Sequence, residues 1–117
     1  MTNKEFAKQL ENRTIRFAID VIELSSELPN TIEANVIKNQ LTKSGTSIGA
    51  NYREANRSRS IKDFKNKIQI SLAEASETDY WLNIIEELNW KDLPKLKELR
   101  QEAKELLAIF TSITNKL

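Results

Sequence analysis

Both glycines of the chain lie in one stretch rich in serine, asparagine and arginine, residue types that can bind phosphate. The stretch covers residues 42–60 and reads TKSGTSIGANYREANRSRS. A Walker-type phosphate loop requires two glycines separated by four residues and followed by lysine, placed between a strand and a helix. Gly45 and Gly49 are separated by three residues, Lys43 precedes them, and no strand-like pattern lies upstream. The spacing therefore disfavours a phosphate loop.

The alternative is that the two glycines allow close packing of helices. They lie one helical turn apart, and small neighbours such as Ser44 keep the adjoining surface thin. Each glycine inside a helix costs about 1 kcal/mol relative to alanine, so close backbone approach is the natural compensation. A turn near Ser60 places small residues of the next segment level with Gly45 and Gly49. We expect the glycines to pack closely against a helix within the bundle, with that segment as a candidate, or against another subunit, and the sequence leaves both choices open.

The same stretch begins a basic region. Residues 53–67 contain six basic and two acidic side chains, whereas residues 74–87 contain five acidic side chains and no basic one. Basic side chains bind the phosphate backbone of nucleic acids without reading base sequence. The competing interpretation is a solvated helix end in which Glu54 pairs with arginines of its own helix. The candidate nucleic-acid contacts are Arg53, Arg57, Arg59 and Lys62.

Catalytic and metal chemistry are disfavoured by composition. The chain has no histidine and no cysteine, which removes Cys/His zinc sites, thiolate nucleophiles and the usual general base near neutral pH. The acidic run also lacks the Glu-x-x-His pairing of di-iron helical bundles. We therefore predict no catalytic residue, no metal site and no cofactor, and a protein that is not an enzyme.

Four amphipathic segments must position these residues. Apolar side chains recur at spacings of three, four and seven in each segment, which is the pattern of one buried helical face. Short links between long helices make sequential neighbours antiparallel, so we predict a single all-α domain, an antiparallel up-down-up-down four-helix bundle. The expected N-caps of the last three helices are Thr31, Ser60 and Asp92. The expected helices cover residues 3–28, 32–58, 60–88 and 92–116 of the domain 1–117.

In such a bundle the link between the second and third helices lies at the same end as both chain termini. The candidate cations therefore gather at one end and the acidic run extends toward the other. Three aromatic residues, Tyr80, Trp81 and Trp90, are close in sequence to the acidic run. They are either packing residues of the bundle or anchors of a protein interface.

Neither the N-terminus nor the helices have membrane-targeting features. The first residues are polar, unlike a signal peptide, and no apolar run approaches the ~18 residues of a membrane span. We expect no membrane contact and a cytoplasmic location.

The second and third segments resemble the bacterial 23S rRNA intervening-sequence protein family, also called four-helix-bundle proteins. The family typically shows a Ser-Ile-x-x-Asn-x-x-Glu-Gly-x-x-Arg-like core, then Phe, then Ala-x-x-Ser. Ala55 stands where the family often has glycine, and Asp79 where glutamate is common. The outer segments match only by pattern. The matching residues are Ser47, Ile48, Asn51, Glu54, Arg57, Phe64, Ala73 and Ser76.

The resemblance implies an all-helical bundle without enzymatic activity that assembles into a ring-like homo-oligomer, commonly a pentamer. Family members are encoded within insertions in ribosomal RNA genes or elsewhere in bacterial genomes. A related group is similar to accessory proteins of retroelements that bind nucleic acid and a reverse transcriptase. We therefore expect an oligomeric adaptor that binds RNA or DNA through its basic end and is linked to rRNA intervening sequences. The alternative is a protein-binding scaffold that docks a protein partner through its aromatic residues, without nucleic-acid binding.

Overall fold

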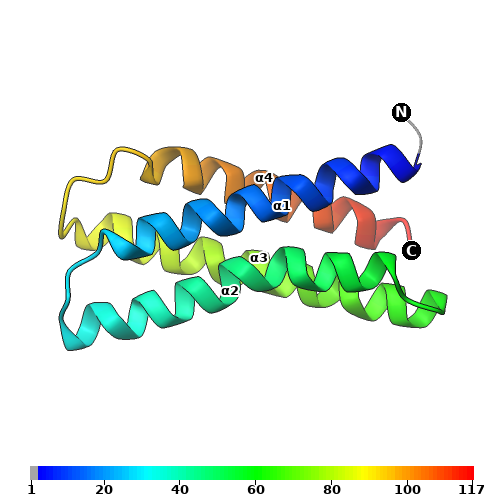
Figure 1. Cartoon of the computed structure of the whole chain (residues 1–117), viewed down its shortest axis with the longest axis horizontal. Coiled ribbons are helices and arrows are strands. Elements are labelled where there is room, and N and C mark those ends of the chain that lie inside the picture. Colours follow the sequence, from blue (N-terminus) through cyan, green and yellow to red (C-terminus); the bar gives the residue numbers. More distant parts are fainter. Residues whose placement is uncertain (1–2) are drawn as a thin grey trace.

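The computed structural model describes residues 3–117, and they form an all-α, up-down-up-down four-helix bundle, as predicted. Successive helices run in opposite directions along the long axis of a molecule that measures 44 × 26 × 20 Å (Figure 1). None of the helices in the described part of the chain is long and apolar enough to cross a membrane. The helices are α1 (Asn3–Ser26), α2 (Ile32–Asn56), α3 (Ile61–Leu88) and α4 (Leu96–Asn115).

Two of the three predicted N-caps are confirmed. The Thr31 hydroxyl accepts a hydrogen bond from the Ala34 amide at 3.1 Å, and the Ser60 hydroxyl accepts one from the Asp63 amide at 3.1 Å. Each hydroxyl satisfies an amide that has no partner within its helix. These caps fix the first residues of α2 and α3.

The third cap is wrong, because α4 begins at Leu96 and Asp92 lies in the link before it. Leu93 precedes Pro94, and a residue before proline is disfavoured in the helical conformation. The chain instead makes a turn in which the Leu96 amide bonds to the Leu93 carbonyl at 3.0 Å. Helix α4 therefore starts four residues later than expected, without a side-chain cap.

The first two helices end two residues earlier than predicted, at Ser26 and Asn56. In both cases the chain continues as tighter turns. The Leu28 amide bonds to the Ser25 carbonyl at 3.2 Å, and the Ser58 amide bonds to the Ala55 carbonyl at 3.1 Å. Such bonds between residues three apart satisfy terminal carbonyls while the helix unwinds into a link.

The core runs the length of the bundle and contains one aromatic pair. The rings of Tyr52 in α2 and Phe110 in α4 meet edge to face at 5.5 Å. Aliphatic side chains from all four helices make up most of the rest of the core. The largest fully buried aliphatic residues are Val21, Leu24, Leu41, Ile48, Ile68, Leu82 and Leu106.

The seam between α2 and α3 contains buried hydroxyl groups. The Ser71 hydroxyl donates to the Ile48 carbonyl at 2.9 Å, and the Thr78 and Ser44 hydroxyls are 2.9 Å apart. A small side chain that bonds across helices lets two backbones approach closely without leaving a buried polar group unsatisfied. The antiparallel alignment of α2 and α3 is the one expected from a turn near Ser60.

The glycines themselves face a different helix. A Cβ atom built on Gly45 would lie 2.8 Å from Val21 Cγ1, and one built on Gly49 would lie 2.6 Å from Thr14 Oγ1. Both contacts belong to α1 of the same chain. The close packing expected at the glycines is within the bundle, and its partner is α1 instead of the third segment. The neighbours of the glycines, Ser44 and Ile48, meet α3. The glycine face packs within one chain.

Candidate nucleic-acid interface

The link between α2 and α3 lies at the same end of the bundle as both chain termini (Figure 1). This end, which we call the basic end, carries all four candidate cations, and all four are exposed. Arg53 lies in the last turn of α2, Arg57 follows that helix as its C-cap, Arg59 is in the link, and Lys62 is in the first turn of α3. The carbonyl groups at the C-terminus of a helix favour nearby cations, which suits Arg53 and Arg57.

The four cations differ in their partners. Arg57 Nη1 lies 4.0 Å from Glu11 Oε1 of α1 and donates to the Arg53 carbonyl at 3.4 Å. Within residues 3–117, no carboxylate lies within 4.0 Å of the side-chain nitrogens of Arg53, Arg59 or Lys62. Arg57 therefore has one carboxylate of α1 at 4.0 Å and the other three cations have none, while all four face solvent.

Three other polar residues of the family motif, Ser47, Asn51 and Glu54, bond to groups of this chain at exposed or partly buried positions. The Ser47 hydroxyl donates to the Lys43 carbonyl at 2.6 Å, and Asn51 Nδ2 donates to the Ser47 carbonyl at 2.8 Å. Glu54 pairs with Lys67 of α3 at 2.8 Å and not with an arginine of its own helix. Together with Arg57, Glu54 joins the end of α2 to its two neighbouring helices.

A shallow hollow of about 560 Å³ lies beside Arg59. Its polar lining includes Ser58 and Ser60, and its apolar lining includes Phe64 and the C-terminal Leu117. No sequence pattern indicates this hollow, because it depends on the C-terminus lying against the α2–α3 link. Arg59 lines this hollow, so its charge lies beside a concave part of the surface.

The three aromatic residues are not one cluster. The rings of Tyr80 and Trp81 meet edge to face at 5.1 Å on α3. Trp90 lies in the α3–α4 link and makes no ring contact with either of them in the described part of the chain. The Tyr80–Trp81 pair lies in the C-terminal half of α3, whereas the basic end is at the start of this helix, so the two are separate surfaces.

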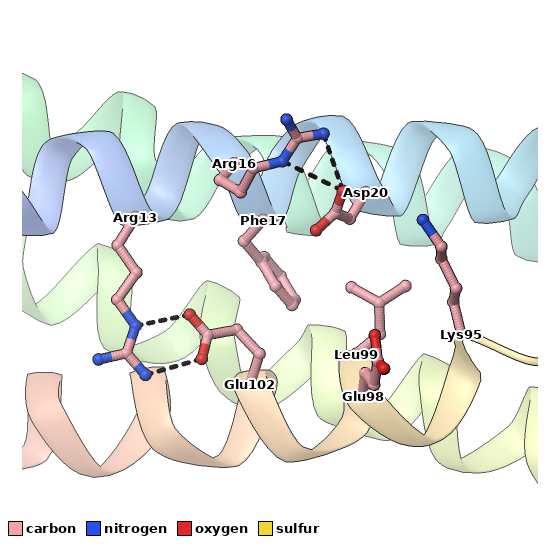
Figure 2. Close-up of a pocket in the computed structure, with 8 residues that line it drawn as sticks. All are labelled: Arg13, Arg16, Phe17, Asp20, Lys95, Glu98, Leu99 and Glu102. Atoms are coloured by element: carbon pink, nitrogen blue, oxygen red, sulfur yellow. Dashed lines mark hydrogen bonds and ion pairs between the residues drawn. The ribbon is translucent and has the colours of Figure 1, made fainter.

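A second groove, between α1 and α4, is occupied by paired charges (Figure 2). Arg13 donates to both carboxylate oxygens of Glu102, at 2.6 and 2.7 Å, and to Glu105 at 2.7 Å. These bonds, the one to Glu102 above all, raise the pKa of Arg13 above its ordinary value. Arg16 pairs with Asp20 at 3.0 Å. The ion pairs of Arg13 join α1 to α4. The charges of both arginines in this groove are balanced by neighbouring carboxylates.

No group of three or more acidic side chains in residues 3–117 is arranged to hold a metal ion.

Comparison with known proteins assigns the family. The model of the 23S rRNA-intervening sequence protein family matches residues 7–112. A crystal structure of a protein of unknown function from the S23 ribosomal protein family of Bacteroides thetaiotaomicron VPI-5482 superposes with a TM-score of 0.83. The two sequences are 32% identical, and the match covers 93% of this chain and 97% of that chain. No curated protein is significantly similar to this chain. The family model spans nearly the whole bundle, and the chain therefore belongs to the 23S rRNA-intervening sequence protein family.

Proposed function

We propose that the protein is a non-enzymatic, oligomeric adaptor whose basic end binds the phosphate backbone of RNA or DNA in the cytoplasm. The observation that carries the proposal is the group of three exposed cations, Arg53, Arg59 and Lys62, without a carboxylate partner in residues 3–117. Membership of a family linked to rRNA intervening sequences supports RNA as the ligand. Arg57 contributes less than these three cations, because Glu11 of α1 lies 4.0 Å from its guanidinium.

The contacts are with phosphates and do not read bases. The three cations project from a helix end, a link and a helix start. Cations presented in this way neutralise phosphates and release counterions, so affinity depends strongly on salt and weakly on base sequence.

A salt titration tests the proposal. For three phosphate contacts, the slope of log affinity against log salt is expected near −2.7 on duplex DNA, a loss of roughly 40-fold between 50 and 200 mM salt. The measurement is fluorescence polarisation with a labelled RNA hairpin and a labelled DNA duplex. Absence of binding at low salt, or binding that salt leaves unchanged, contradicts the proposal.

The outer face of α1 supports the oligomeric part of the proposal. Ile15, Ile19 and Ile22 recur at spacings of four and three, and they remain 50%, 39% and 49% exposed. We call them the isoleucine stripe. Burying such side chains against a second copy stabilises an assembly by about 25 cal/mol per Å² of apolar surface. By the family resemblance we propose five copies, and the assembly raises the avidity of a small basic end.

Ile19→Glu is expected to dissociate the assembly, because it places a charge in the middle of the isoleucine stripe. Light scattering coupled to size exclusion measures the mass, which should fall toward that of the 13.5 kDa chain. Ile32→Glu is the matched control, since Ile32 is 83% exposed in the first turn of α2, away from the stripe. A wild-type protein that is monomeric at all concentrations, or equal effects of the two variants, rules out this interface.

A further inference from the structure

Helix α3 has a second apolar face besides the one that it buries. Its outer face includes Ile70, Trp81, Ile84 and Leu88, at helical spacing. Ile70 and Leu88 are 41% and 43% exposed, and Trp81 and Ile84 are half-buried. We call this set the α3 outer face. Trp81, Ile84 and Leu88 form a row of apolar side chains that the neighbouring helices cover only in part, and Glu74 and Glu77 separate Ile70 from this row.

Carboxylates without cationic partners lie along and beside this row. Glu74 and Glu77 occupy the same face, and Glu87 lies beside Leu88. In the described part of the chain, no lysine or arginine nitrogen lies within 4.0 Å of these three carboxylates. Partial burial and the proximity of Glu77 raise the pKa of Glu74, while Lys43 lowers it. A cation brought to this face would be favoured by each carboxylate.

The exposed aromatic rings are suited to the same kind of partner. Tyr80 is 58% exposed and its ring meets Trp81 edge to face, so one ring supports the other. Trp81 Nε1 donates to Glu77 at 3.4 Å, which fixes the indole next to a carboxylate. Guanidinium and ammonium groups are attracted to the faces of such rings, and tryptophan and tyrosine are frequent interface anchors.

We infer that the α3 outer face binds a basic polypeptide segment with apolar side chains at helical spacing. The face from Ile70 to Leu88 is about 27 Å long at 1.5 Å per residue, or about five helical turns. The apolar side chains of the partner lie against Trp81, Ile84 and Leu88, and its arginines or lysines meet the carboxylates. Charge complementarity decides the class of partner, because the same carboxylates repel nucleic acid, anionic lipid and an identical face of a second copy.

Intrinsic fluorescence can follow this binding at one site. Trp90→Phe leaves Trp81 as the only indole of the chain. A synthetic peptide of about five helical turns, with leucines on one face and arginines elsewhere, should shift Trp81 emission to shorter wavelengths at low salt. The same peptide with glutamate in place of arginine should leave the emission unchanged. In a Trp81→Phe protein, the emission of Trp90 should also remain unchanged.

Carboxylate variants separate a specific face from general attraction. Glu74→Gln/Glu77→Gln is expected to weaken peptide binding by about threefold to tenfold, the size of two partly exposed ion pairs. Glu23→Gln/Glu98→Gln makes the same charge change on α1 and α4 and should alter binding by less than about twofold. A protein in which Arg53, Arg59 and Lys62 are glutamine should bind the peptide as the wild type does, because these residues lie outside the α3 outer face. Failure here is therefore distinguishable from failure of the basic end.

Several results overturn the inference. They are the absence of an emission shift with the arginine peptide, an equal shift with the glutamate peptide, or equal weakening by the two double variants. A fourth is a change of oligomeric mass in Glu74→Gln/Glu77→Gln, which assigns the face to a second copy of this chain. Circular dichroism checks that each variant retains its helices.

Discussion

Replacing Arg53, Arg59 and Lys62 together by glutamine is expected to reduce nucleic-acid affinity by about 100-fold at low salt and to bring the salt slope close to zero. These are the candidate cations with no carboxylate partner in the described residues, so their whole charge is available to phosphates. All three are exposed in helix-end or link positions, so glutamine removes the charge without opening the core. Fluorescence polarisation across a salt series measures both quantities.

The matched control removes the same charge elsewhere. Lys95→Gln/Lys97→Gln/Lys104→Gln changes three exposed lysines at and beyond the start of α4. We expect it to weaken binding by less than about threefold, through long-range electrostatics alone. If the two triple variants lose affinity equally, the basic end is not the interface. A separate Arg57→Gln variant should lower the salt slope by less than a change at Arg53 or Arg59 does, because Glu11 lies 4.0 Å from Arg57.

Alanine at either glycine is expected to destabilise the bundle, although alanine is the better helix former. At Gly49 the added Cβ would lie 2.6 Å from Thr14 Oγ1 and 2.8 Å from Thr14 Cβ. Overpacking of this kind costs about 1–3 kcal/mol, against a gain of about 1 kcal/mol in helix propensity. We expect a net loss of up to about 2 kcal/mol for Gly49→Ala and a smaller loss for Gly45→Ala.

The two sites should differ in how they are rescued. At Gly45 the nearest atoms are Val21 Cγ1 and Cγ2, at 2.8 and 3.0 Å, and Val21→Ala removes both. At Gly49, Thr14→Ala removes Oγ1 but retains the Cβ at 2.8 Å. We therefore expect a favourable coupling of about 1 kcal/mol or more in the Gly45–Val21 double-mutant cycle. The Gly49–Thr14 cycle should show a smaller coupling.

Urea unfolding followed by circular dichroism measures these free energies. Ala50→Gly on the exposed side of α2 supplies the propensity difference, about 1 kcal/mol, at a neighbouring position without a clash. Gly45→Ala and Gly49→Ala variants that are both more stable than wild type would show that α1 moves away at little cost. The close approach of α1 and α2 would then not explain the glycines.

The helices and their caps follow from local rules, which is why the sequence predicts them. Thr31 and Ser60 act on amides three residues away, and a seven-residue repeat defines a buried face without knowledge of the neighbours. The late start of α4 also follows from a local rule, the restriction that Pro94 places on Leu93, which outweighs the capping tendency of Asp92.

The partner of the glycines depends on a non-local quantity. Gly45 and Gly49 share a face of α2, and the rotation of α2 about its own axis decides whether that face meets α1 or α3. That rotation results from packing of the whole core. The environment of the cations also depends on packing. In the sequence Arg57 is grouped with Arg53 and Arg59, but its contact with Glu11 exists only because α1 lies beside the end of α2.

The position of the chain termini has a consequence for any fusion to this bundle. Both termini lie at the basic end with the α2–α3 link (Figure 1). Leu117 lines the hollow beside Arg59, so a tag or fused domain on the C-terminus would occupy space at the proposed nucleic-acid contact. The α1–α2 and α3–α4 links lie at the opposite end of a molecule 44 Å long. Those links are the places where a label or an inserted sequence leaves the basic end accessible.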